Sequence, residues 1–237
     1  MNVLITGGSR GIGRACVELF AKNGHNTAFL YRSSEDKAME LCTKTGATAI
    51  KCDVSDAGEV RLAVAKAAED LGGVDVLINN AGIADFAFFD TITDEQWRKM
   101  IDTDLSGAFY VSREAVKHML VKKSGVIINI GSMWGKVGAS CEVHYSAAKA
   151  GLRGMTLALA KEVGPSGIRV NCIEPGVIAT EMNAHLSEDD MKALCAETPL
   201  CRIGMPFDVA ELAYFLASDK ASFITGQIIG VDGGFAI

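Results

Sequence analysis

The chain has 237 residues, of which 49% are hydrophobic and 22% are charged, and its formal net charge at pH 7 is −6. This composition fits a single globular domain over residues 1–237, and the negative charge argues against nucleic acid or an anionic membrane as a partner. No apolar stretch has the length of a membrane span, and we expect no signal peptide.

Short apolar runs that favour β-strands alternate with longer helical patterns along the chain. The strand candidates cover 3–6, 27–31, 48–53, 75–81, 125–132, 169–176 and 227–234. Their nearly continuous apolar character is typical of parallel strands covered on both faces. Helical patterns cover 12–23, 56–71, about 143–163, and a long stretch that begins with the capping box at 93–96 and runs toward 122. The alternation predicts an α/β fold, a single doubly wound (Rossmann) domain with a seven-stranded parallel sheet flanked by helices.

The segment 181–207 departs from this alternation. It is helical in places, mixed in polarity, and carries Pro199 and Pro206. Ligands bind near the carboxyl ends of parallel strands, so an irregular insertion there is well placed to carry function. We therefore expect 181–207 to form a lid over the substrate.

The seven cysteines predict a reducing location. Their number is odd, and neither a CxxC pair nor a Cys/His cluster is present. Disulfide frameworks and structural zinc sites both depend on such spacings. We expect free thiols, a cytoplasmic location and no bound metal.

A glycine-rich turn follows the first predicted strand. In the sequence TGGSRGIG, Gly7, Gly11 and Gly13 lie at the turn and at the opening of the next helix. Glycine lets the backbone approach a ligand closely, and a helix N-terminus offers free N–H groups to a pyrophosphate. Because a strand precedes the motif and a helix follows it, the motif predicts a dinucleotide site rather than a turn without a ligand.

The end of the second strand favours NADP(H) over NAD(H). An acidic residue there would hold the ribose hydroxyls of NAD, but this strand ends in LYRSS, without an acid. Arg32 and Ser33 could bind a 2′-phosphate with Arg10 beside them, because guanidinium groups donate to phosphate in a bidentate fork. The other interpretation is that both arginines are solvated surface groups.

Polar residues at the ends of later strands complete a predicted site. Asp53 and Val54 end the third strand, the motif NNAG over 79–82 ends the fourth, and Ser132 ends the fifth. In a doubly wound sheet these strand ends converge on one ligand crevice. Tyr145 opens the helix that follows the fifth strand.

With these motifs, the chain resembles the short-chain dehydrogenase/reductase family. The resemblance rests on TGGSRGIG, DV, NNAG, Ser132 with Tyr145-x-x-x-Lys149, and PGVIAT, and it extends to ITGQIIGVDGG near the end of the chain. It implies catalytic roles for Ser132, Tyr145 and Lys149. It also implies cofactor contacts from Gly7, Ser9, Arg10, Gly11, Ile12, Gly13, Arg32, Ser33, Asp53, Val54, Asn80, Ala81, Gly82, Tyr145, Lys149, Ile178 and Thr180.

The chemistry of ketone reduction accounts for the catalytic residue types. A carbonyl that receives a hydride needs a proton on its oxygen, but a free tyrosine, with a pKa of about 10, is a weak acid near neutral pH. Lys149 lies on the same helical face as Tyr145, so its ammonium is expected to lower the pKa of Tyr145. Tyr145 would be the acid in reduction and the base in oxidation, while Ser132 donates to the carbonyl. By resemblance, Lys149 also holds the nicotinamide ribose.

One position departs from the family pattern. Many members carry an asparagine in the long central helix, whose main-chain carbonyl holds a water in a proton relay, and the matching residue here is Asp104. The backbone carbonyl survives this change, but the side chain adds negative charge near Lys149. We count Asp104 among the catalytic residues and expect it to change the pH dependence of the enzyme.

Within the family, the chain most resembles the 3-oxoacyl-[acyl-carrier-protein] reductases of fatty acid synthesis, with which it shares RIG, FLASD and ITG near its end. Those enzymes bind an acidic carrier protein through basic residues beside the cleft, and Lys122 and Lys123 are candidates for that contact. The pair could equally be a helix end favoured by the helix dipole. Ser166 stands where some members have a basic residue.

Two other functions remain open. The sequence pattern SMWGxVGASCEVxYS resembles that of a subgroup of the family. This subgroup is proposed to reduce a ketone on a modified lysine of elongation factor P (5-aminopentanone reductase type). Glu142 could then meet a cationic part of the substrate, although Trp134, Cys141 and Glu142 could also be packing or solvated residues. The third possibility is a non-catalytic NADP(H) sensor, although a sensor does not need an acid such as Tyr145.

By resemblance, the long helices at roughly 93–121 and 145–163 pair across a twofold axis in related proteins. We therefore expect a homodimer or a homotetramer.

Overall fold

The computed structural model describes residues 1–183 and 186–236. Seven parallel strands form one sheet in the order β3-β2-β1-β4-β5-β6-β7. They are β1 (Asn2–Thr6), β2 (Asn26–Tyr31), β3 (Thr48–Lys51), β4 (Val76–Asn79), β5 (Gly125–Ile130), β6 (Ile168–Pro175) and β7 (Ile228–Val231). Because the chain winds one way from β1 to β3 and the other way from β4 to β7, the sheet is doubly wound, which confirms the predicted fold.

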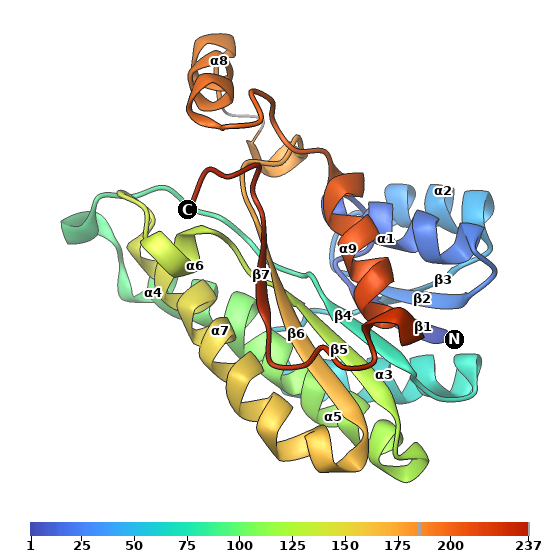
Figure 1. Ribbon diagram of the computed structural model, residues 1–237. Coiled ribbons are helices and arrows are strands. Elements are labelled where there is room, and N and C mark those ends of the chain that lie inside the picture. The colour runs from blue at the N-terminus through green and yellow to red at the C-terminus, as the bar shows by residue number, and fades with distance from the viewer. Residues whose placement is uncertain (184–185, 237) are drawn as a thin grey trace.

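Helices cover both faces of this sheet (Figure 1). They are α1 (Gly11–Lys22), α2 (Glu35–Thr45), α3 (Ala57–Leu71), α4 (Asp94–Ile101), α5 (Gly107–Lys122), α6 (Trp134–Val137), α7 (Val143–Val163), α8 (Glu188–Glu197) and α9 (Pro206–Ala217). One apolar cluster joins the sheet to α1, α2 and α9, and a second joins its other face to α3, α5 and α7.

The central strands contribute to both clusters because successive side chains of a strand point to opposite faces. Ile5 and Ile78 belong to the cluster with α1 and α9, whereas Leu4 and Leu77 belong to the cluster with α3 and α5. All four side chains are fully buried. This burial on both faces explains why the strands read as continuous apolar runs in the sequence.

The predicted long helix from the capping box toward residue 122 is present, and it contains a π-helical turn that the sequence did not predict. The capping box is present, since Thr93 Oγ1 accepts the Gln96 N–H at 3.1 Å and Gln96 Oε1 accepts the Thr93 N–H at 3.0 Å. The helical backbone continues from α4 through a π-helical turn, Asp102–Ser106, into α5. The next residue is Gly107, where a side chain would bring its Cβ to 2.9 Å from Cγ2 of Val54. The π turn therefore lies where this helix approaches the end of the third strand closely, and π turns are frequent at functional sites.

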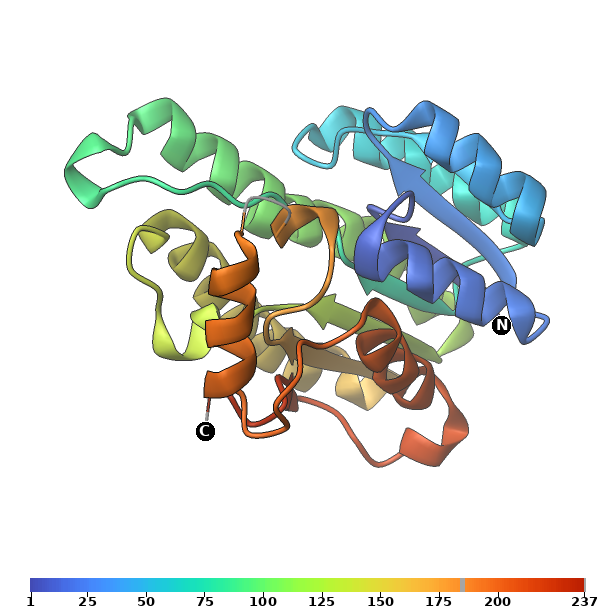
Figure 2. The same cartoon turned by 90° about the horizontal axis from the view of Figure 1, so that it is seen from above.

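The predicted lid contains α8 and a short 3₁₀ turn, η4 (Glu181–Asn183). In Figure 1, α8 stands above the carboxyl ends of the strands, apart from the two helical layers, and Figure 2 shows the same orange segment from above. Residues 184–185 of the predicted lid lie outside the described residues. The position at the carboxyl edge agrees with the expected place of a lid, and its role remains a prediction.

Lys122 and Lys123 lie at the other edge of the sheet. The Lys122 ammonium donates to Asp75 at 2.7 Å, and Asp75 immediately precedes β4. Tyr145 lies beside the opposite, carboxyl ends of the strands. Within one chain, these lysines therefore do not flank the cleft, and that prediction was wrong. Lys123 has a φ of 51° as the C-terminal cap of α5, in line with the alternative that the pair is a helix end.

Within residues 1–183 and 186–236, no helix combines the length and the apolar character that crossing a bilayer requires.

Candidate active site

The glycine-rich turn joins β1 to α1 and is fastened to the end of β4. Gly7 and Gly11 have positive φ values of 64° and 55°. A side chain at Gly13 would place its Cβ 2.3 Å from the carbonyl oxygen of Gly7 and 2.5 Å from Nδ2 of Asn80. The Asn80 amide donates to the carbonyl oxygens of Thr6 and Gly7 at 3.0 and 3.1 Å. Close packing behind the turn thus sets the approach of the backbone to the start of α1, where a pyrophosphate would find free N–H groups.

A cleft of about 360 Å³ opens in front of this turn. The predicted cofactor residues that line it are Gly7, Ser9, Arg10, Gly11, Ile12, Arg32, Ser33, Asp53, Val54, Asn80, Ala81, Gly82 and Thr180. The turn and the cleft together fit a dinucleotide, with α1 at the pyrophosphate and the end of β2 at the adenosine.

Four predicted cofactor residues do not line this cleft. Gly13 packs behind the turn, and Ile178 is 4% exposed within the core around α9. Tyr145 and Lys149 are also absent from its lining. In contrast, the lining includes Glu181, which the sequence analysis assigned only to the lid. Its position directly after Thr180 in the chain was the available signal.

Ser132, Tyr145 and Lys149 meet at the end of β5. The Lys149 ammonium lies 5.4 Å from the centre of the Tyr145 ring and donates to the carbonyl oxygen of Ile130 at 3.3 Å. The Ser132 hydroxyl accepts the N–H of Trp134 at 3.2 Å, and it lies close enough to Tyr145 to lower the pKa of that residue. Ser132 is 6% exposed, Tyr145 8% and Lys149 4%. The three residues that the sequence predicted as catalytic therefore form one largely buried cluster.

Asp104 in the π-helical turn contacts this cluster. Its Oδ2 lies 3.1 Å from Nζ of Lys149, and its Oδ1 accepts the N–H of Ile83 at 2.9 Å. Asp104 is 1% exposed. A side chain at Gly82 would place its Cβ 2.7 Å from Oδ2 of Asp104, so the glycine provides the room that the carboxylate occupies. The negative charge predicted near Lys149 is therefore part of a direct, buried ion pair.

Burial and the ion pair act together on the titration of the cluster. Burial raises the pKa of Tyr145 by more than the Lys149 ammonium lowers it, and the Asp104 carboxylate raises it further. Lys149 thus acts in the expected direction, but the expectation of a lowered pKa does not hold for this arrangement. Burial also raises the pKa of Asp104, against the influence of Lys149. Burial lowers the pKa of Lys149, but Asp104 and Tyr145 raise it by more, so the lysine is held as an ammonium.

Further ionisable side chains lie around Tyr145. His144 is completely buried, and neither ring nitrogen has a hydrogen-bond partner within the described part of the chain. Its Nε2 lies 3.9 Å from Oδ2 of Asp85. Glu142 is 7% exposed, and its charge raises the pKa of Tyr145. In residues 1–183 and 186–236, no three His, Cys, Asp or Glu side chains are grouped so that they could hold a metal ion.

The doubly wound sheet, the glycine turn and the Ser–Tyr–Lys cluster define a class of nicotinamide-dependent enzymes. A family model described as "Enoyl-(Acyl carrier protein) reductase" matches residues 7–236. The chain belongs to the short-chain dehydrogenase/reductase family. It is an oxidoreductase that acts on CH–OH groups and ketones, which sets aside the non-catalytic sensor.

Named relatives match the chain over nearly its whole length. The 3-oxoacyl-[acyl-carrier-protein] reductase FabG of Staphylococcus aureus is 39% identical, over 98% of this chain and 97% of the relative. The protein of the same name from Chlamydia muridarum is 40% identical, over 98% of this chain and 96% of the relative. The crystal structure of gox2181 superimposes with a TM-score of 0.93 at 36% identity, over 98% of this chain and 94% of that one.

Proposed function

We propose that the protein uses NADPH to reduce the ketone of a 3-oxoacyl thioester carried by acyl carrier protein, a reaction of fatty acid synthesis in the cytoplasm. The buried cluster of Ser132, Tyr145 and Lys149 at the carboxyl edge of the sheet carries the proposal. The relatives named as 3-oxoacyl-[acyl-carrier-protein] reductases, at 39% and 40% identity, support the substrate class.

The residues of the cluster have separate tasks in the proposed reaction. The hydroxyl groups of Ser132 and Tyr145 hold the ketone oxygen, where negative charge develops as the carbonyl carbon is reduced. Tyr145 then gives its proton to that oxygen and becomes a phenolate. The Lys149 ammonium stabilises the phenolate by its charge at the distance of 5.4 Å from the ring. In the oxidation direction, the same phenolate takes the proton back.

Residues of the cleft would hold the cofactor, which supplies the hydride when it is bound. The N-terminus of α1 and the glycine turn would bind the pyrophosphate. Asn80, Gly82 and Thr180 also line the cleft and would contact the cofactor. Arg10 and Arg32 line its adenosine end, so a 2′-phosphate would meet two guanidinium groups there. This charge supports NADP(H) over NAD(H).

The test is NADPH consumption with three thioesters: a 3-oxoacyl chain on acyl carrier protein, the same chain on a small thiol, and a 2-enoyl chain of equal length. We expect turnover of the 3-oxo substrates, a loss of at least about a hundredfold in Tyr145→Phe, and little reduction of the enoyl chain. Tyr214→Phe is the matched control, because Tyr214 packs against Phe20 away from the cluster. Turnover of the enoyl thioester alone, or an active Tyr145→Phe variant, would contradict the proposal.

A second substrate, the ketone on a modified lysine of elongation factor P, is favoured by one observation. Glu142 is 7% exposed and lies close enough to Tyr145 to raise its pKa. A thioester gives such a carboxylate no cation to meet, whereas an amino-ketone side chain would. Under this alternative, Glu142→Gln lowers kcat/KM for the ketone-modified factor and leaves a neutral 3-oxoacyl thioester unaffected. Equal effects on both substrates would remove Glu142 as a reason for the alternative.

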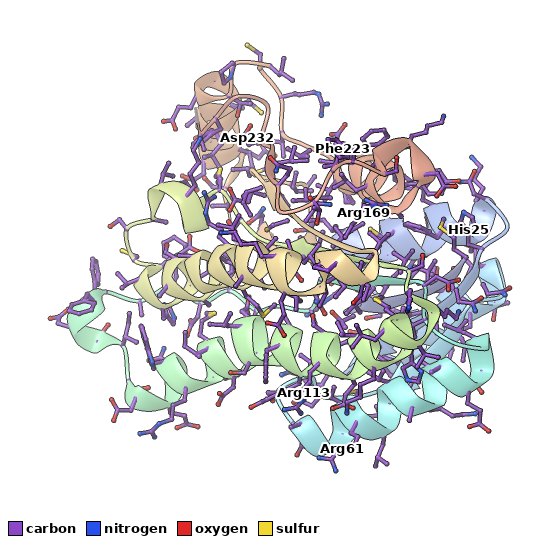
Figure 3. All side chains as sticks on the ribbon, turned by 60° about the horizontal axis from the view of Figure 1, so that its bottom comes forward. His25, Arg61, Arg113, Arg169, Phe223 and Asp232 are labelled. Carbon is purple, nitrogen blue, oxygen red and sulfur yellow. The ribbon has the colours of Figure 1, made fainter. Side chains whose placement is uncertain are left out.

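We also propose that the chain forms a homodimer or homotetramer. On α5, Phe109 is 46% exposed and Val121 is 86% exposed, and the guanidinium carbon of Arg113 lies 5.2 Å from the centre of the Phe109 ring. Phe223 is fully exposed on the other side of the molecule from Arg113 (Figure 3). Exposed apolar side chains on two sides support association about more than one axis. A monomeric mass in light scattering at all concentrations would exclude both assemblies.

A further inference from the structure

The cations at the adenosine end of the cleft are held by carboxylates of the chain itself. Arg32 Nη1 lies 3.7 Å from Oδ2 of Asp53. On the other side, Arg10 Nη1 lies 3.6 Å from Oε2 of Glu181, and the Lys37 ammonium forms a short ion pair with Oε1 of the same glutamate. Each oxygen of the Glu181 carboxylate therefore faces a different cation.

The two cations that meet at Glu181 come from separate parts of the fold. Arg10 is the N-terminal cap residue of α1, and Lys37 lies in the first turn of α2, the helix that follows β2. In the sequence analysis, the end of β2 and Arg10 were the predicted contacts of a 2′-phosphate. Lys37 was not part of that prediction, and it adds a third positive charge to the same end of the cleft.

Glu181 joins this cationic site to the predicted lid. It follows Thr180 in the cleft lining and is the first residue of η4, which leads toward α8. The hydrogen bond from Lys37 lowers the pKa of Glu181, so the side chain is an anion at neutral pH. Its side chain is 53% exposed and that of Arg10 is 56% exposed. Ion pairs as exposed as these are weak and can be exchanged for a stronger anion.

We infer that Arg10 and Lys37 form a subsite for the 2′-phosphate of the cofactor, and that Glu181 occupies this subsite as an internal anion until the phosphate displaces it. The inference rests on the proposed use of NADPH. A phosphate group carries more negative charge than a carboxylate and has more acceptor oxygens, so it competes well for the same donors. NADH lacks this phosphate and leaves Glu181 in place. The start of the lid would therefore be released by NADPH and not by NADH.

The experiment is calorimetric titration with 2′,5′-ADP and with 5′-AMP, which differ only in the 2′-phosphate. In Glu181→Gln we expect 2′,5′-ADP to bind about three- to tenfold more tightly and 5′-AMP to bind unchanged, because one competing surface charge is gone. In Lys37→Met we expect 2′,5′-ADP to bind more weakly by a similar factor. Glu197→Gln is the control, because it removes the same charge from the exposed end of α8.

The outcomes separate this inference from the cofactor proposal. If the unmodified protein binds 2′,5′-ADP no better than 5′-AMP, both fail. If it prefers 2′,5′-ADP but Glu181→Gln changes nothing, or tightens both ligands equally, only the role of Glu181 fails. Amide hydrogen exchange adds a second readout: NADPH should speed exchange in residues 186–197 of the unmodified protein, and NADH should not. Equal exchange with both cofactors would exclude release of the lid by the 2′-phosphate.

Discussion

Replacing Asp104 with asparagine tests the electrostatics of the catalytic cluster directly. The substitution removes one negative charge and keeps the shape of the side chain. Lys149 Nζ lies 3.1 Å from the Asp104 carboxylate and 5.4 Å from the centre of the Tyr145 ring. The carboxylate and the ring are therefore separated by no more than the sum of these distances. At a separation of about 8.5 Å and an effective dielectric constant of about 20, two unit charges interact by about 2 kcal/mol, or about 1.4 pKa units.

The direction of the effect follows from the role of Tyr145 as an acid. Asp104 raises the pKa of Tyr145, so the Asp104→Asn variant should have a lower one. Reduction needs the protonated tyrosine and is lost as the pH rises through that pKa. The alkaline limb of kcat/KM for ketone reduction should therefore move to lower pH by about one unit or more.

The assay is NADPH oxidation with a saturating and a limiting ketone concentration, measured from neutral to alkaline pH. Asp102→Asn is the matched control, because it removes the same charge from the exposed side of the same π-helical turn. Its profile should coincide with that of the unmodified enzyme. If the Asp104→Asn profile also coincides with it, or moves to higher pH, Asp104 does not set the pKa of Tyr145 and the reasoning fails.

Three further substitutions test other parts of the structure. Gly13→Ala should weaken NADPH binding by about tenfold or more, because overpacking behind the glycine turn costs about 1–3 kcal/mol. An unchanged Kd in a fluorescence titration would contradict the close packing at this position. Gly154→Ala should raise the free energy of unfolding, measured in urea, by about 0.5–1 kcal/mol, because Gly154 lies in α7 and its new Cβ meets no atom within 4 Å. A lower free energy of unfolding would indicate that another copy of the chain covers this face. Arg153→Met should lower the free energy of unfolding by about 3–5 kcal/mol in the same assay, because Glu174 is 3% exposed and both of its oxygens accept from Arg153. An unchanged unfolding midpoint would show that the pair adds no stability.

The fold could be predicted because the strands are buried on both faces, which gives each one a continuous apolar run. The π-helical turn between α4 and α5 could not, because such a turn adds a residue without changing the composition of the helix. The turn brings Asp104 into contact with Lys149 and Ile83. The resemblance to the family predicted a negative charge near Lys149. The Asp104 side chain is 1% exposed, and only the structure shows this burial, on which its effect on the pKa of Tyr145 depends.

The position of Lys122 shows a different limit of sequence reasoning. In a sequence, a pair of adjacent lysines predicts a basic patch but does not show where that patch lies. In the structure, α5 runs opposite to the strands and ends at their amino edge. Lys122 therefore pairs with Asp75, and Tyr145 lies at the far edge. The direction of each helix relative to the sheet was implicit in the predicted winding. Applying it would have placed these lysines away from the chain's own cleft.

The catalytic cluster and the adenosine end of the cleft each contain ion pairs, but these pairs differ in burial. In the catalytic cluster, Asp104 and Lys149 are both buried, so removing either side chain would leave the other without its partner, and both groups influence the pKa of Tyr145. At the adenosine end, Lys37 and Glu181 are 144 positions apart in the chain and half exposed, so water and a phosphate both compete for the lysine. The depth of burial, which no spacing of residues in the sequence encodes, makes the first pair a fixed part of the reaction and the second a contact that a ligand can replace.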